Sequence, residues 1–423
     1  MYAVKIYCPE ATNRIKYIFD VFFGNLIICN YEFISDKKEF LKADGIKINY
    51  SEDDFYSKFL IKPFGLLHSN NIELQRISII NYESYPAFFA VDDSNLPFDI
   101  FSAAFYLITR YEEYLPHFKD KFGRYSHSSS IAFNAGFLNF PLVNFWAVKL
   151  CYALNSTFGD VVLQTRTFSY QPTYDIDMAW SYKNKGFNRN AGGFMKQPGL
   201  SRILTLAGLK KDPFDSFDFL SSLKTSKIPL YFFLVSEQNG IYDKNILPSN
   251  KAFRNLIKSV TGKVLLHPSW QSNADPEIVK REKEILEDIT GTNISAGRQH
   301  YIKFQLPETF CDLLNCGITD EYSMGYGTIN GFRASISSPY KWYNLSTEEI
   351  TDLTIHPFCF MDANSFYEQK QDLAATEKEL NFYLEICKSN GCDLITIFHN
   401  NFLGSSPEFS GYRQMYSDFL SRI

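Results

Sequence analysis

The sequence predicts an α/β protein with a smaller α/β or α+β N-terminal domain, residues 1–165, followed by a (β/α) barrel, residues 166–423. The first observation is length, because 423 residues exceed the size at which a single hydrophobic core usually divides. The second is the order of the expected elements. From about residue 168, short apolar strands alternate with amphipathic helices, a pattern typical of a parallel sheet. The third is number, since about seven such strands approach the count of a (β/α) barrel.

Each expected element of the second part can be placed on the sequence. The predicted strands are 168–177, 229–235, 262–267, 294–296, 331–334, 353–358 and 393–399, and the predicted helices are 217–223, 252–260, 276–289, 307–315 and 374–388. The clearest helix start is Asp275-Pro276, where the aspartate caps the helix and proline takes the first helical position. The segment 181–211, rich in Gly, Asn and Lys, is expected to be a long loop near the barrel mouth.

The first part is less regular. Two helices are predicted, over 98–114 after the start signal Asn95-Leu96-Pro97 and over 141–154, each with apolar residues along one stripe. Strand-like pieces such as 88–91 lie around them. These signals limit the fold class of the N-terminal domain to α/β or α+β. They do not indicate its function.

Composition excludes some classes of function. The net charge is −5 and there is no basic run, so nucleic-acid binding has no electrostatic support. The most apolar stretch, 17–29, is too short and too interrupted to cross a membrane, and the first residues do not resemble a signal peptide. The eight cysteines are scattered and lack zinc-knuckle spacing, which favours a reduced cytoplasmic protein with buried thiols.

The most informative stretch is Thr173-Tyr174-Asp175-Ile176-Asp177, which closes the first predicted strand of the second part. Asp175 and Asp177 are two residues apart, so on an extended chain both side chains point to the same face. Paired carboxylates repel unless a proton, a cation or a metal lies between them. The stretch is therefore either part of a metal-assisted hydrolytic site or a strand end with two solvated aspartates.

Polar residues follow several other predicted strands. Three of the seven histidines, His267, His300 and His399, directly follow or closely trail an apolar strand candidate, and Arg298 lies just before His300. In a parallel barrel the carboxyl ends of the strands meet on one face, where catalytic residues collect. Each histidine alone is typical of a core or surface position, but together with the aspartate pair they indicate a site.

These motifs resemble, in order, those of the NodB-homology polysaccharide deacetylases. The first-strand motif has the family's Asp-x-Asp form, and Pro229–Val235 is similar to its second strand. His267-Pro268-Ser269-Trp270 stands where the histidine motif belongs, Arg298-Gln299-His300-Tyr301 resembles Arg-x-Pro-Tyr with His replacing Pro, and Ile397-Phe398-His399 resembles the final Leu-x-His. The whole chain further resembles a group of Bacteroidetes proteins that pair an uncharacterised N-terminal domain with such a barrel.

The resemblance implies a distorted (β/α)7 barrel and a role for each motif residue. Asp175 would be the general base, Asp177 and His267 would hold a divalent, Zn-like metal ion, and His399 would be the general acid. Arg298 would pair with Asp175 and keep it ionised.

One departure concerns the metal. The family's histidine motif usually supplies a second histidine four residues after the first, and here that position is Gln271. Three explanations stay open. In the first, His300 is the third ligand. In the second, Gln271 binds the metal through its carbonyl oxygen. In the third, the site lacks full ligation and the barrel is a sugar-binding or scaffold protein.

Four further side chains are candidates for substrate binding. Trp180 could stack on a sugar ring or pack on the rim, and Ser269 could donate to substrate or cap the next segment. Arg333 could clamp a carboxylate or form a structural ion pair, and Asn400 could bind substrate hydroxyls. No nucleophile elbow, dinucleotide fingerprint or phosphate loop is present.

The function expected is metal-dependent hydrolysis of a non-peptide carbon–nitrogen bond, as N-deacetylation of a glycan or sugar conjugate. The expected partner is a carbohydrate substrate. The alternative is a catalytically degenerate barrel that binds glycans or acts as a scaffold. A glycosidase pair is disfavoured, because Asp175 and Asp177 crowd one face of one strand.

Overall fold

We describe residues 3–159, 162–196 and 199–423 in a computed structural model of the chain. The strands are β1 Ala3–Tyr7, β2 Asn30–Ile34, β3 Ile46–Asn49, β4 Ile80–Tyr82, β5 Tyr85–Ala87, β6 Ser169–Ile176, β7 Leu230–Phe233, β8 Lys263–Leu266, β9 Ala296–Gly297, β10 Asp320–Glu321, β11 Tyr340–Asn344, β12 Glu349–Ile355, β13 Phe360–Met361 and β14 Asp393–His399. The α-helices are α1 Asn13–Phe19, α2 Lys37–Lys42, α3 Ile100–Ile108, α4 Ile131–Asn134, α5 Leu142–Phe158, α6 Gly186–Lys196, α7 Leu200–Leu206, α8 Phe217–Ser222, α9 Lys251–Ser259, α10 Pro276–Thr290, α11 Glu308–Asn315, α12 Leu373–Ser389 and α13 Tyr412–Ser421.

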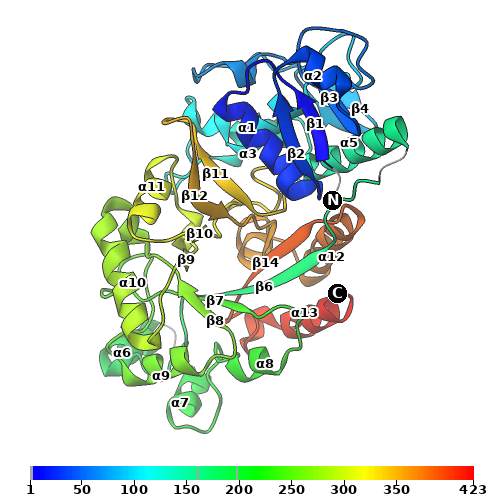
Figure 1. Cartoon of the computed structure of the whole chain (residues 1–423). Coiled ribbons are helices and arrows are strands. Elements are labelled where there is room, and N and C mark those ends of the chain that lie inside the picture. The colour runs from blue at the N-terminus through cyan, green and yellow to red at the C-terminus, as the bar shows by residue number, and fades with distance from the viewer. Residues whose placement is uncertain (1–2, 160–161, 197–198) are drawn as a thin grey trace.

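The second part of the chain forms one large, mostly parallel sheet (Figure 1). Within the described residues its strand order is β11-β12-β10-β9-β8-β7-β6-β14-β13, and only β11 and β12 pair antiparallel. Helices such as α9, α10, α12 and α13 lie along its outside. In the described part of the chain, β11 and β13 are the edge strands and do not pair with each other. The fold is therefore mixed α/β, and the closed, distorted barrel stays a prediction.

The N-terminal part has its own small parallel sheet, β2-β1-β3, and the hairpin β4-β5. In this part, a side-chain cap sets the start of α3 and a change in backbone conformation sets its end. Asp99 caps α3 by accepting the N–H groups of Phe101 and Ser102. The helix predicted over 98–114 is shorter than expected, because Arg110 adopts a left-handed conformation, φ 56°, before a 3-10 turn over Tyr111–Tyr114.

Two ion-pair groups, each with a buried arginine from the N-terminal part, join that part to the second part of the chain. Arg14 of α1 lies 2.5 Å from Glu348, just before β12. Glu113 accepts from both Arg110 and Arg333, at 2.7 Å and 2.6 Å, with all three side chains almost fully buried. The apolar core also runs through both parts without a break. The division into domains at residue 165 therefore stays a prediction from sequence.

Some sequence-based expectations need correction. The predicted strand 331–334 is a turn in which Gly331 has φ 139°, and the strand at that point of the sheet is β10. The expected loop 181–211 contains α6 and α7, although its residues 197 and 198 lie outside the described residues. The other predicted strands and helices of the second part correspond to observed elements whose ends differ by a few residues.

Candidate active site

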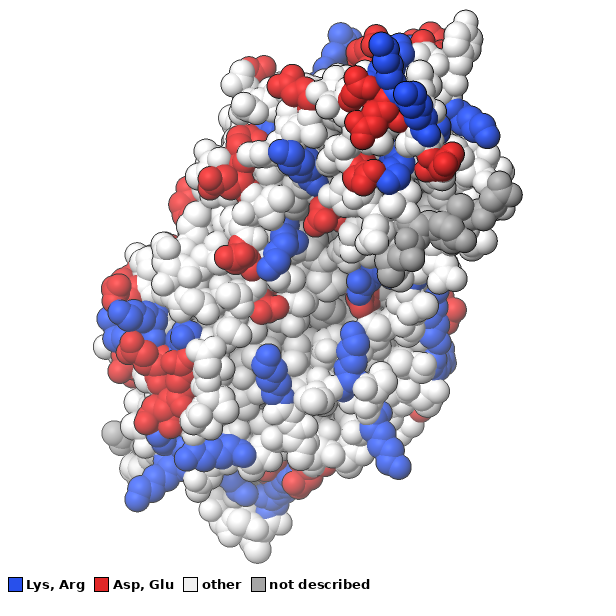
Figure 2. Space-filling view, in the orientation of Figure 1, with Lys and Arg blue, Asp and Glu red and all other residues white. Residues whose placement is uncertain are grey.

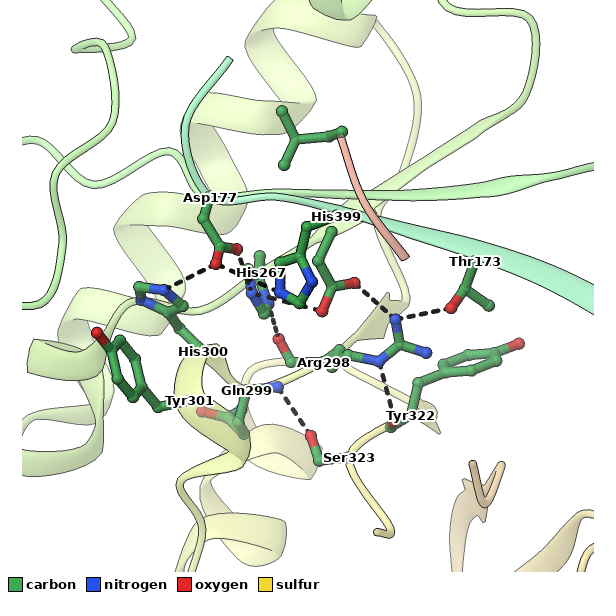
Figure 3. Close-up of polar contacts among 12 residues, drawn as sticks. Thr173, Asp177, His267, Arg298, Gln299, His300, Tyr301, Tyr322, Ser323 and His399 are labelled. Carbon is green, nitrogen blue, oxygen red and sulfur yellow. Dashed lines mark hydrogen bonds and ion pairs between the residues drawn. The ribbon is translucent and has the colours of Figure 1, made fainter. Parts of the chain in front are cut away.

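The predicted chemistry-bearing residues come together at the carboxyl ends of the strands. Asp175 lies near the end of β6 and pairs in register with His399 at the end of β14. Asp177 follows β6, His267 follows β8, and His300 lies just beyond β9. Figure 3 shows Asp177 pointing toward three imidazole rings. The sheet thus brings together residues more than two hundred positions apart in the sequence, as its parallel topology requires.

Asp177, His267 and His300 form a group that could hold a metal ion. One donor atom from each lies within 4.8 Å of the others. Asp177 lies 3.1 Å from His267 Nε2 through Oδ1 and 3.5 Å from His300 Nε2 through Oδ2. Asp177 Oδ1 is a buried oxygen that makes no hydrogen bond. Two imidazoles and one carboxylate with an unsatisfied oxygen fit the donor set of a catalytic divalent metal.

In both histidines of this group, the second ring nitrogen, Nδ1, makes a hydrogen bond. Nδ1 of His267 donates to the carbonyl oxygen of Arg298 at 2.5 Å, and Nδ1 of His300 donates to Asp243 Oδ1 at 2.8 Å. Because each Nδ1 is engaged in this way, Nε2 is the ring nitrogen left to bind a metal ion, and in both rings it lies beside Asp177. Such outer partners fix the tautomer and the ring orientation of metal-ligating histidines.

The charges in this group depend strongly on one another. Burial alone would raise the pKa of Asp177, but His300 and His399 hold it well below its usual range. Burial alone would lower the pKa of His300, but Asp177 and Asp243 raise it to about 9. Asp177 is therefore ionised at neutral pH and presents a full negative charge to any cation.

Asp175 and Arg298 form a buried pair beside the metal-ligand group. Arg298 Nη1 donates to Asp175 Oδ1 at 2.6 Å and to Thr173 Oγ1 at 2.9 Å, while its Nε donates to the carbonyl oxygen of Tyr322. The guanidinium also lies 4.1 Å from the ring centroid of Phe232. These contacts fix the carboxylate beside a permanent cation, and the other oxygen, Oδ2, lies 3.8 Å from the Nε2 atom of His267.

His399 is paired with a carboxylate that was not expected from the sequence. Its Nδ1 donates to Asp362 Oδ1 at 2.6 Å, and its Nε2 lies 3.5 Å from Asp177 Oδ2. Burial alone would lower the pKa of His399, but Asp362 and Asp177 raise it to about 10. At neutral pH the ring is therefore an imidazolium, which can give up a proton.

These side chains line a cavity of about 400 Å³. From the expected set it includes Asp175, Asp177, His267, His300 and His399. Its wall also includes aromatic side chains to which the sequence analysis gave no role. Phe122 of the N-terminal part packs against Tyr301 with ring centroids 5.4 Å apart, and Tyr301 in turn lies 4.8 Å from the ring of His300. Tyr242 lines the same wall.

Arg124 connects the N-terminal part to the loop that carries His300. Its Nη1 donates to the carbonyl oxygen of Tyr301, its Nη2 to that of Gly327, and its Nε to Asp120 at 2.7 Å. Tyr301 has φ 61°, a left-handed conformation that costs free energy for a residue with a bulky side chain. Arg124 thus holds the backbone next to a proposed metal ligand in an uncommon conformation.

The geometry favours His300 over Gln271 as the candidate third donor beside Asp177 and His267. Gln271 does not line the cavity, and its Nε2 lies 3.3 Å from Asp243 Oδ2. Gln271 therefore contacts the carboxylate behind His300 and does not face Asp177. His300 is thus the imidazole that the structure places beside Asp177 and His267.

None of the four side chains expected to bind substrate lines the cavity. The expectation that they contact substrate is therefore corrected. Arg333 is buried in the ion pair with Glu113, so it has the structural role that was the alternative. Trp180 is 8% exposed and belongs to the core. Ser269 is buried, and its backbone N–H donates to Glu282. Asn400 is buried and donates to the carbonyl oxygens of neighbouring loops.

Sequence reasoning missed the carboxylates behind the histidines. Asp243 lies in the loop after β7, where nothing in its neighbours distinguishes it from a surface aspartate. Asp362 directly follows the short apolar run Phe358–Met361, and this was a signal of the same kind as the one that identified His399. Phe122 and Arg124 carry no local signal, because only the packing of the two parts brings them to the cavity.

Comparison with known proteins yields little about activity. Residues 4–159 match a model described as a family of unknown function (DUF7033). No curated protein matches the chain. A protein from Mycobacterium smegmatis assigned as a polysaccharide deacetylase aligns at a TM-score of 0.38 and 13% identity, over 61% of this chain and 84% of that chain. The polysaccharide deacetylase from Bacillus cereus aligns at 0.28 and 12% identity, over 61% and 88%.

Proposed function

We propose that the chain is a metal-dependent hydrolase of a non-peptide carbon–nitrogen bond that removes the acetyl group from an N-acetylated sugar. The observation that carries this proposal is the convergence of Asp177, His267 and His300 on one centre beside a buried Asp–Arg pair and an Asp–His pair. The order of the motifs and their similarity to the polysaccharide deacetylases support the choice of an acetamido substrate. Membership in the Bacteroidetes group stays part of the proposal.

The chain's own residues divide the proton transfers between them. A Zn-like ion held by Asp177, His267 and His300 would acidify water and polarise the acyl oxygen. Asp175, held by Arg298 Nη1 at 2.6 Å, accepts the proton of the attacking water. His399 donates a proton to the leaving nitrogen as the carbon–nitrogen bond breaks. One water is consumed, and the products are acetate and the free amino sugar.

The cavity suits a small part of a glycan. Its volume of about 400 Å³ lies in the ~300–1,000 Å³ range of small-molecule sites. Phe122, Tyr242 and Tyr301 give one wall an aromatic character on which the apolar face of a sugar ring can pack. We therefore propose that these side chains replace the four corrected residues as the sugar-binding surface.

The test measures acetate release. The purified protein is stripped with a chelator, reloaded with zinc or cobalt, and incubated with N-acetylated oligosaccharides of different linkage. We expect acetate and free amine in equal amounts from at least one substrate, and no release from the stripped protein. Asp175→Asn is expected to keep the metal and lose activity. Full metal loading without acetate release from any substrate would favour the sugar-binding alternative.

We also propose a reducing, cytoplasmic location. The support is that the eight cysteines form no disulfide in the described part of the chain, and six of them are buried. No helix in the residues that the structure describes is long and apolar enough to cross a membrane.

A further inference from the structure

Helices α6 and α7 expose apolar side chains where helices normally expose polar ones. Seven large apolar side chains in this segment are between 39% and 85% exposed: Phe187, Phe194, Met195, Leu200, Ile203, Leu206 and Leu209. On α7 the usual arrangement is reversed, since Thr205 is fully buried while Leu200, Ile203 and Leu206 face solvent. Exposed apolar side chains gathered in this way indicate a surface that contacts something other than water.

The same segment is uniformly basic. Residues 183–211 contain seven of the chain's 42 Lys and Arg residues and none of its 47 Asp and Glu residues. Figure 2 shows an uncharged projection at the lower end of the molecule, where Figure 1 places α7, with Lys and Arg side chains and some Asp and Glu side chains above it. Because the whole chain carries a net charge of −5, this segment is a local excess of positive charge in an acidic protein, with Lys211 at its end paired to Asp215 and Asp218.

The two helices are held against each other and against the mouth of the cavity. Arg202 of α7 donates to the carbonyl oxygen of Asn190 in α6. Arg189 of α6 donates to the carbonyl oxygens of Lys244 and Asn245, and Lys244 lines the catalytic cavity. The apolar side chains are therefore presented from a fixed pair of helices beside the cavity.

We propose that α6 and α7 form a membrane-docking surface that binds the headgroup region of an anionic lipid bilayer. Apolar side chains on one face and lysine or arginine around them are the features by which a helix lies in the interfacial plane of a membrane. The absence of acidic residues between 183 and 211 matches an anionic surface better than a mixed-charge protein partner. Docking through this surface would bring the cavity mouth close to the bilayer.

Vesicle co-sedimentation tests the proposal without any assay of hydrolysis. The wild-type protein is expected to bind vesicles of phosphatidylcholine mixed with phosphatidylglycerol and to stay in solution with phosphatidylcholine alone. Adding salt should weaken binding, because the attraction is partly electrostatic. Failure of the wild type to bind the anionic vesicles contradicts the proposal.

Two variants separate the apolar and the charged contributions. Leu200→Asn with Ile203→Asn and Leu206→Asn should lower the partition coefficient at least about tenfold. Lys183→Gln with Lys210→Gln should lower it roughly fivefold per lysine removed. The control is Leu74→Asn with Phe118→Asn, which removes exposed apolar side chains from the N-terminal part and should leave binding unchanged.

The alternative occupants give different results. Self-association would appear as a dimer in sedimentation velocity that the α7 variant dissociates, with no vesicle binding by the wild type, and this overturns the proposal. Equal vesicle binding by the wild type, the α7 variant and the lysine variant also overturns it. Melting curves for all variants confirm that the substitutions leave the fold intact.

Discussion

Asp243 Oδ1 lies 2.8 Å from Nδ1 of His300, on the side of the ring opposite Asp177. The related motif has proline at the position of His300. The contact with Asp243 fixes the tautomer of this histidine and makes it a candidate metal ligand. Asp243 is itself buried and also receives the backbone N–H of Trp270. The pair therefore positions a candidate third ligand in a chain that carries Gln271 in place of the usual second histidine.

The first prediction concerns Asp243. Asp243→Asn should lower zinc affinity about 10- to 100-fold, because the ring of His300 loses the carboxylate that orients it and raises its basicity. Competition with a chromogenic chelator measures the dissociation constant. Asp320→Asn is the matched control, since Asp320 forms a similar pair with His356 at 2.8 Å outside the cavity. Equal losses in both variants would show that the effect is not specific to His300.

The second prediction separates the proton donor from the metal. His399→Asn should lower kcat about 10²- to 10⁴-fold, the usual contribution of a general acid or base. Zinc content, measured by mass spectrometry, should stay at the wild-type value. Asp362→Asn should lower kcat less, because Asp362 positions the ring and does not transfer the proton. A His399 variant that loses its zinc as well would assign the residue to the metal and not to proton transfer.

The third prediction concerns stability and pH. Burial alone would raise the pKa of Glu113, but Arg333 and Arg110 lower it to about 2. A carboxylate with a depressed pKa stabilises the fold above the unfolded-state pKa, and this contribution is lost as pH falls from about 4.5 toward 2. Its size is about 3 kcal/mol at neutral pH.

Urea unfolding of the wild type and Glu113→Gln at pH 7 and pH 3 measures this effect. The free-energy difference between the two proteins should shrink by about 2 kcal/mol at the lower pH. Glu349→Gln, at an exposed position on β12, is the control and should show no such change. A difference that stays constant between the two pH values would contradict the assignment of the depressed pKa to Glu113.

The fourth prediction tests the wall supplied by the N-terminal part. Phe122→Ala should raise KM for the oligosaccharide about 3- to 10-fold with little change in kcat, because an aromatic contact contributes about 0.5–1.5 kcal/mol. Phe118→Ala is the control, since Phe118 lies on the same segment but is 79% exposed and outside the cavity. An unchanged KM in the Phe122 variant would remove this side chain from the sugar-binding surface.

The sequence was informative where the relevant signal is local. An apolar strand ending in a polar residue identified Asp177, His267 and His399, because alternation and strand ends can be read without knowing the fold. It was misleading at 331–334, where an apolar-looking run around Arg333 is a turn whose arginine is neutralised by Glu113, 220 positions away. The partners Asp243 and Phe122 depend on how distant segments pack, and no local pattern encodes that, whereas Asp362 follows an apolar run and could have been found by the same rule.

Isothermal titration of the stripped protein with zinc tests the central claim most directly. We predict one site per chain, lost in His300→Ala and in His267→Ala but retained within about tenfold in Gln271→Ala, whose side chain contacts Asp243 and not the ion. Zinc binding that survives in His300→Ala and disappears in Gln271→Ala would contradict the assignment of the metal centre.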